Sequence, residues 1–155
     1  MILVTGATGF IGSYLLCHLA EKNIYPVALY RSDTKKNSIQ SIFESKFSDG
    51  KSQFEKIVWR KGDLTDFPSL EEAFQGITKV YHCAALISFS HSKIKKLIEI
   101  NEQGTSYIVN LCLSHKVKKL IYVSSIAALG KEETSNDVDE ETPWNNNEEK
   151  TPYAY

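Results

Sequence analysis

Short apolar runs recur along the chain at intervals that are too long for β-hairpins. They occupy residues 2–6, 25–31, 56–63, 79–85 and 119–125. The centres of these runs contain β-branched and aromatic residues without strict alternation of apolar and polar positions, which is typical of strands buried on both faces. The pattern therefore predicts a parallel sheet that is covered by helices.

Helical periodicity separates these runs. The clearest helix is expected over residues 92–115, where apolar side chains recur at steps of three and four residues. Asn101 and Gly104 fall on the same stripe, and apolar packing does not explain either residue there. Further helices are expected over residues 10–22 and 69–75. Alternating strands and helices with right-handed crossovers predict a doubly wound α/β domain of the Rossmann type, with strand order 3-2-1-4-5.

The chain shows no internal repeat and no linker. We therefore expect residues 1–155 to form one domain or part of one. Only residues 131–150 break the alternating pattern, because they are rich in acidic residues and asparagine. This stretch predicts a long polar loop.

Composition and charge narrow the classes of function. The formal net charge is −1, and the lysines at 93–96 and 116–119 are balanced by acidic residues, so no nucleic-acid partner is expected. The absence of a leader-like or long apolar segment predicts a cytoplasmic protein that does not enter a membrane. Cys17, Cys83 and Cys112 lie far apart in apolar surroundings, which predicts reduced, buried thiols. Neither these cysteines nor the histidines show the spacing of a metal site.

The first expected strand leads into VTGATGFIG, in which Gly6, Gly9 and Gly12 are spaced by three residues. Gly6 permits a tight turn, Gly9 lets backbone amides approach a diphosphate, and Gly12 allows the following helix to pack closely on the sheet. The helix N-terminus adds partial positive charge and free N–H donors. We favour dinucleotide binding over a turn of purely conformational origin, because the motif lies between a strand and a helix.

Five stretches of the chain occur in the order TGATGFIG (5–12), GDLTD (62–66), HCAA (82–85), NEQGT (101–105) and VSSIAALG (123–130). Together they resemble the extended short-chain dehydrogenase/reductases, that is, the NAD-dependent epimerase/dehydratase superfamily. Arg31, directly after Tyr30, resembles the arginine of the dihydroflavonol reductase-like branch, which faces the 2'-phosphate. The resemblance implies that GDLTD contacts adenine, that HCAA lines the ribose and nicotinamide, and that VSSIAALG carries a catalytic serine. The cofactor-binding residues that we expect are Gly6, Thr8, Gly9, Phe10, Ile11, Gly12, Arg31, Ser32, Asp63, Leu64, Cys83, Ala84, Ala85, Val123 and Tyr153.

Three of these stretches also have a structural interpretation. Asp63 can simply cap a turn. Cys83, Ala84 and Ala85 are small enough to belong to the core. Asn101 can tie down a neighbouring backbone loop through hydrogen bonds, which is a role in stability that the resemblance leaves open.

The end of the second expected strand bears on the choice of cofactor. An acidic side chain there suits the ribose of NAD, whereas a basic one suits the additional phosphate of NADP. Tyr30 stands where many NAD-dependent relatives place an aspartate, and Arg31 and Ser32 follow it. We therefore expect a preference for NADP(H), with NAD(H) as the other possible cofactor. In the alternative interpretation, Arg31 is merely exposed and Asp33 serves NAD.

The last residues, TPYAY, resemble the start of the Y-x-x-x-K catalytic helix of the family. The resemblance assigns Tyr153 as the acid–base residue, with its lysine expected at position 157, and Ser125 as the group that hydrogen-bonds the substrate oxygen. Tyr155 is the alternative tyrosine, and two ordinary loop tyrosines are the alternative without catalysis. We expect the sequence to be the cofactor-binding part of a longer enzyme whose substrate-binding region lies beyond it.

The function expected is hydride transfer between NADP(H) and a carbonyl or alcohol substrate, which is a small molecule. An NAD-dependent sugar-nucleotide epimerase or dehydratase and a non-catalytic dinucleotide-binding module are the alternatives. A homodimer is possible. The 155 residues by themselves are expected to bind cofactor with little or no turnover.

Overall fold

The computed structural model describes residues 1–129, 139–142 and 153, and these contain a five-stranded parallel sheet. The strand order is β3-β2-β1-β4-β5, which confirms the predicted Rossmann-type sheet. The strands are β1 (Ile2–Thr5), β2 (Val27–Tyr30), β3 (Val58–Lys61), β4 (Lys79–His82) and β5 (Lys119–Tyr122). Each is shorter than the apolar run that predicted it, because the last residues of each run belong to the loops at the carboxyl edge; the runs at 25–31 and 56–63 also begin two residues before their strands.

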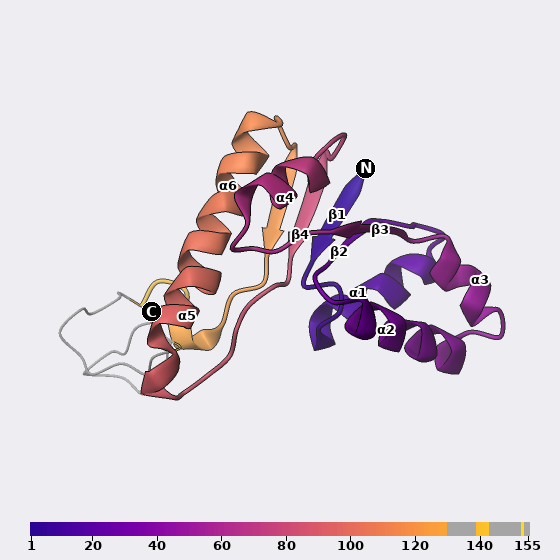
Figure 1. The fold of residues 1–155 in the computed structure, drawn as a ribbon, viewed down its shortest axis with the longest axis horizontal. Helices are drawn as coiled ribbons and strands as arrows, with labels where there is room; N and C mark the ends of the chain where they lie inside the picture. The colour runs from indigo at the N-terminus through magenta and orange to yellow at the C-terminus, as the bar shows by residue number, and fades with distance from the viewer. Residues whose placement is uncertain (130–138, 143–152, 154–155) are drawn as a thin grey trace.

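Helices cover both faces of this sheet (Figure 1). One layer contains α1 (Phe10–Glu21), α2 (Asp33–Lys46) and α3 (Gly50–Glu55). The other layer contains α4 (Phe67–Ala73), α5 (Ile94–Leu97) and α6 (Gly104–Ser114). Helices α2 and α3 were absent from the sequence prediction, because few of their residues are apolar. Their buried apolar side chains are those of Ile39, Phe43 and Phe54.

Two apolar clusters hold these layers together, and consecutive residues of β1 point into different clusters. Leu3 packs with α4 and α6, whereas Val4 packs with α1, α2 and α3. This alternation follows from the two-residue repeat of a strand. The prediction of burial on both faces holds for the core of β1 and β2 and is wrong for β3 and β5, the two outer strands, which are partly exposed.

The single helix expected over residues 92–115 is divided into segments. A 3-10 turn, η1 (His91–Lys93), precedes α5, and a π-helical segment, η2 (Ile98–Gln103), lies between α5 and α6. Asn101 belongs to the π-helical segment and Gly104 is the first residue of α6. Both residues that broke the apolar stripe therefore lie where the helix geometry changes.

The predicted polar loop at 131–150 lies outside the described residues, apart from residues 139–142. Tyr155 also lies outside them. Across the part of the chain that is described, no helix has the length and apolar character required to cross a membrane.

Candidate functional site

A cleft of about 290 Å³ opens at the carboxyl edge of the sheet. Residues that follow four different strands reach it, because parallel strands end at the same edge of a sheet. It is lined by Gly6, Thr8, Gly9, Leu29, Tyr30, Arg31, Ser32, Lys35, Gly62, Asp63, Leu64, Cys83, Ala84, Ala85, Leu86 and Ile100. The structure therefore brings together ten of the residues expected to bind the cofactor, from four separate sequence stretches.

The turn from β1 into α1 forms one wall of the cleft. Gly6 has a φ of 63°, and a Cβ atom there would lie 2.6 Å from the backbone N of Ala84. The Gly9 amide donates to the carbonyl of Gly6 at 2.9 Å, which closes the tight turn. Gly12 is buried, and a Cβ atom on it would overlap the Gly6 carbonyl. The glycines at 6 and 12 therefore allow the turn to pack against the loop after β4 and against the first helix.

The N-terminus of α1 suits an anionic ligand. Gly9 is its N-cap residue, no side chain caps it, and its first turn has no acidic residue. The first amides of a helix lack intrahelical partners and carry the positive end of the helix dipole. A diphosphate fits this exposed turn, whose first amides no side chain caps.

Three residues of the glycine motif that were expected to bind the cofactor do not line the cleft. Phe10 and Ile11 have exposed side chains, and Phe10 packs at an angle against Tyr14 of its own helix. Gly12 is turned inward. If Phe10 and Ile11 bind the cofactor as expected, they do so through their backbone amides and not through their side chains.

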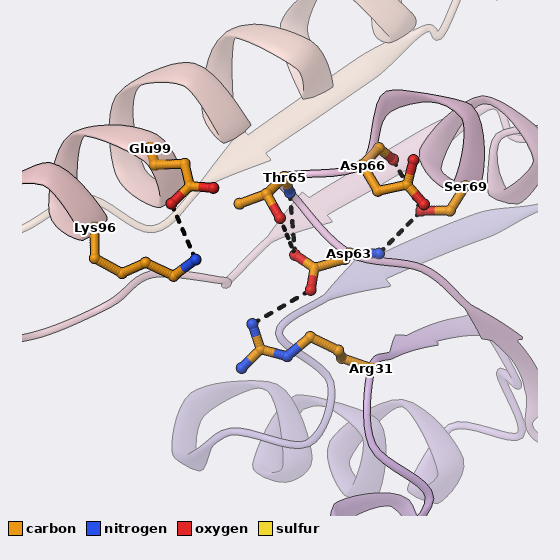
Figure 2. Close-up of polar contacts among 7 residues, drawn as sticks. All are labelled: Arg31, Asp63, Thr65, Asp66, Ser69, Lys96 and Glu99. Atoms are coloured by element: carbon orange, nitrogen blue, oxygen red, sulfur yellow. Dashed lines mark hydrogen bonds and ion pairs between the residues drawn. The ribbon is translucent and has the colours of Figure 1, made fainter.

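Asp63 follows β3 and is fixed by the turn that it begins (Figure 2). Its Oδ1 accepts hydrogen bonds from the amide and the hydroxyl of Thr65, both at 3.0 Å, and its own amide donates to Oγ of Ser69 at 3.1 Å. The other carboxylate oxygen lies 3.4 Å from Nη1 of Arg31. Burial raises the pKa of Asp63, but the Thr65 hydrogen bonds and the Arg31 charge outweigh it and hold the pKa below its ordinary value. Asp63 thus both caps a turn and lines the cleft, so the two interpretations of this residue are compatible.

The first turn of α2 adds a basic residue that the sequence analysis missed. Lys35 lines the cleft beside Arg31, whereas Asp33 is not among the lining residues and instead pairs with Lys61 at 3.7 Å. Lys36 lies over the Tyr30 ring at 5.1 Å. Recognition of a helix at 33–46 would have placed Lys35 one turn from Arg31.

The loop after β4 is attached to the π-helical segment by one amide side chain. Asn101 Oδ1 accepts from the Leu86 amide at 2.7 Å, and its Nδ2 donates to the Leu86 carbonyl at 2.9 Å. Leu86 lines the cleft. These contacts agree with the structural interpretation of Asn101, in which its side chain fixes a neighbouring backbone loop through hydrogen bonds.

His82 lies beneath this loop and is fully buried. Hydrogen bonds join its Nδ1 to Thr5 Oγ1 at 2.6 Å and its Nε2 to Thr105 Oγ1 at 3.0 Å, and its ring stacks on Tyr122. Burial lowers the pKa of His82 to about 4. A neutral imidazole therefore connects the ends of β1 and β4 to α6 below the cleft.

Small residues after β4 shape the cleft without filling it. Cys83 and Ala84 are half-buried and Ala85 is exposed, so the interpretation of these residues as core holds only for Ala84, which packs against the apolar cluster that contains Leu3. The prediction of three buried thiols is likewise correct only for Cys17 and Cys112. Burial raises the pKa of the Cys83 thiol. It is therefore an uncharged part of the lining.

The residues beyond β5 lie apart from this lining. Val123 donates its amide to the His82 carbonyl at 3.0 Å, and Oγ of Ser125 accepts from the Ala127 amide at 3.2 Å, which caps the 3-10 turn η3 (Ile126–Ala128). The ring of Tyr153 makes an edge contact with Phe89, with centroids 6.1 Å apart. Ser125 and Tyr153 are both described, and no hydrogen bond joins them.

The sheet order, the glycine turn and the cleft define a dinucleotide-binding fold, and comparison with known proteins assigns its family. The family model for the NAD dependent epimerase/dehydratase family matches residues 2–155. The chain belongs to this family, and the predicted resemblance to extended short-chain dehydrogenase/reductases is confirmed.

Curated relatives include dihydroflavonol 4-reductase from Callistephus chinensis, which is 32% identical over 92% of this chain and 38% of the reductase. The bifunctional dihydroflavonol 4-reductase/flavanone 4-reductase from Pyrus communis is also 32% identical, over 92% of this chain and 40% of its own length. The chain therefore spans about two fifths of the length of these relatives, which are enzymes.

Solved structures give the same fold. UDP-glucose 4-epimerase from Bifidobacterium longum, in complex with NAD+ and UDP, superposes with a TM-score of 0.75 at 25% identity, over 99% of this chain and 44% of the epimerase. The terminal R domain from the myxalamid PKS-NRPS biosynthetic pathway gives a TM-score of 0.77 at 27% identity, over 99% of this chain and 41% of that domain.

Proposed function

We propose that the chain is the cofactor-binding part of an NADP(H)-dependent oxidoreductase that transfers hydride between the nicotinamide and a carbonyl or alcohol substrate. One observation carries the preference for NADP(H): Arg31 and Lys35 both line the cleft beyond β2, where Tyr30 stands in place of an acidic residue. Two cations at this edge suit an additional phosphate on the ribose. Asp33, the alternative group for NAD, is paired with Lys61 instead.

In this proposal each part of the lining has a separate task. Amides of the β1–α1 turn, near Gly9, bind the diphosphate. Asp63 and Leu64 border the adenine, and the segment from Cys83 to Ala85 borders the ribose and nicotinamide. When bound, the cofactor supplies or accepts the hydride.

The proton is assigned to groups at the other end of the site. The hydroxyl of Ser125 would hydrogen-bond the substrate oxygen, and the hydroxyl of Tyr153 would donate or accept the proton as the charge on that oxygen changes. Oγ of Ser125 accepts one backbone hydrogen bond, and a hydroxyl that accepts can still donate to a substrate oxygen.

Exposed apolar side chains support a carbonyl substrate with an apolar body. Ile87 and Phe89 follow β4, Ile126 follows Ser125, and all three side chains are exposed by 66% or more. A sugar nucleotide would require more polar partners than these side chains offer. The NAD-dependent epimerase stays the second candidate because of the likeness to the epimerase structure that contains NAD+ and UDP.

Separate titrations of the purified chain with NADPH and NADH test the cofactor. We expect NADPH to bind more tightly, and Arg31→Ala or Lys35→Ala to weaken NADPH binding by about tenfold while changing NADH binding little, since a charge-assisted contact to phosphate is lost.

Lys36→Ala is the matched control, because Lys36 has the same charge and stands next to Lys35, but its ammonium group lies over the rings of Tyr30 and Trp59. Tighter binding of NADH than of NADPH would refute the preference. Binding of neither nucleotide would refute a dinucleotide site in this chain.

A further inference from the structure

The charged residues that line the cleft are Arg31, Lys35 and Asp63. Two of them are cations that suit a phosphate, and the third is an anion that opposes one. Asp63 is ionised at neutral pH, because its pKa is held below the ordinary value. This carboxylate lies close enough to Arg31 to oppose the binding of a phosphate there.

The two partners of the Arg31–Asp63 ion pair are held very differently (Figure 2). Asp63 is fixed through Thr65 and Ser69, as described above, and its side chain is 29% exposed. Arg31 is 61% exposed and touches Asp63 with one nitrogen at 3.4 Å. A guanidinium has five N–H donors, so Arg31 can keep or leave this contact while it binds another anion.

We propose that Asp63 is a specificity-determining counter-charge that keeps the cleft open to NAD(H) as well as NADP(H). The inference rests on the proposed dinucleotide site and deepens it. Without a ribose phosphate, Asp63 neutralises Arg31, so the charge of Arg31 stays compensated beside a bound NAD(H). With a ribose phosphate present, Arg31 turns to the phosphate together with Lys35, and Asp63 weakens that attraction by its own negative charge.

Two effects of removing the carboxylate oppose each other. Without the ion pair, Arg31 would adopt more rotamers and would lose more conformational freedom when it binds the phosphate, which disfavours NADP(H). This effect is small, because an exposed ion pair restricts the rotamers of its side chains only weakly. Loss of the negative charge strengthens the attraction of both cations for phosphate, and this effect acts over several ångströms. The second effect is the larger, so neutralising Asp63 should increase the preference for NADP(H).

The test compares the dissociation constants of NADH and NADPH for the wild-type chain and for Asp63→Asn. Asparagine keeps an oxygen that can accept from Thr65, removes the charge and replaces the other carboxylate oxygen with an NH2 group of nearly the same size. We expect the ratio of the NADH constant to the NADPH constant to rise by about three- to tenfold. Any lost contact with adenine affects both nucleotides equally and cancels in the ratio.

Asp66→Asn is the matched control. It makes the same change of charge in the same turn, but Asp66 is exposed and is not part of the cleft lining, so the ratio should stay at the wild-type value. If Asp63→Asn does not fold, as judged by circular dichroism, the same ratio is measured for Asp63→Ser, which removes the same charge.

An unchanged or lower ratio in the Asp63 variant, with both nucleotides bound by the wild-type chain, would overturn this inference and leave the proposed function standing. An equal rise in Asp66→Asn would also overturn it, because net charge alone would then explain the shift. Failure of the wild-type chain to bind either nucleotide would overturn both proposals.

Discussion

The cleft and the segment beyond β5 differ in the number of contacts that hold them among the described residues. At the cleft, each wall is fixed from several directions, by the tight turn at Gly6, by the hydrogen bonds on Asp63 and by Asn101 on the β4 loop. At the β5 end, Ser125 caps one 3-10 turn and Tyr153 touches Phe89. Among the described residues, several contacts therefore position the proposed nucleotide side, whereas few contacts position the proposed reaction side.

This difference predicts which substitutions should affect stability and nucleotide binding. Changes at the cleft should disturb stability and nucleotide binding together, since the same contacts serve both. Changes at the β5 end should leave both nearly intact and should affect only chemistry. The following predictions test this contrast in order of expected effect.

The largest effect is expected for Gly6→Ala. A residue other than glycine is strained at a φ of 63°, and its Cβ atom would lie 2.6 Å from the Ala84 amide nitrogen. We expect a loss of about 3 kcal/mol or more in the free energy of unfolding, measured by urea denaturation.

Gly9→Ala is the control for this change. The Cβ atom at residue 9 would lie 3.2 Å from the Gly6 carbonyl oxygen, so the loss should stay below about 1 kcal/mol, while the new methyl group at the cleft weakens NADPH binding. Equal losses of stability in the two variants would contradict the assigned role of the Gly6 turn.

The second effect is a dependence of stability on pH that comes from His82. Its pKa is lowered from 6.5 to about 4 in the folded chain, so the unfolded chain binds more protons between these values. Stability should therefore be fully present above about pH 6.5 and should fall as the pH decreases towards 4, by up to about 3 kcal/mol.

Urea denaturation at several pH values measures this dependence. His82→Gln cannot titrate and should reduce the slope in this window, whereas His91→Gln, at an exposed histidine, should retain it. An unaltered slope in His82→Gln would exclude His82 as its source.

The third prediction concerns Asn101→Ala. This change removes both hydrogen bonds to Leu86, and we expect a loss of about 1–3 kcal/mol in stability together with weaker NADPH binding, because Leu86 lines the cleft. Asn110→Ala, at an exposed position of α6, should cost less than about 0.5 kcal/mol. Wild-type stability in Asn101→Ala would mean that the loop does not depend on this amide.

The smallest effect is expected for Ser125→Ala. The lost hydrogen bond caps only a three-residue 3-10 turn, so stability should fall by about 1 kcal/mol or less, and NADPH binding should not change. Calorimetric titration with NADPH checks the second expectation. A large loss of binding would show that the two ends of the site are coupled, against the contrast drawn above.

The sequence was sufficient for the sheet order and for the turn at the glycines, since strand burial and the 3.6-residue repeat depend on local pattern. It was less informative wherever local pattern is weak. Helix α2 was missed because its surface is mostly polar, and with it Lys35. The exposure of β3 was also missed, because a run of apolar residues looks the same in an inner and an outer strand.

By itself, then, the sequence determined the class of fold and the residue types at the carboxyl edge of the sheet. Only the tertiary structure decided how they pair. It turned Asp33 towards Lys61, Asp63 towards Arg31, and Asn101 towards Leu86. These partners are 15 to 32 positions apart, and strand register and helix packing bring them together. Such long-range geometry has no signature in spacing along the chain.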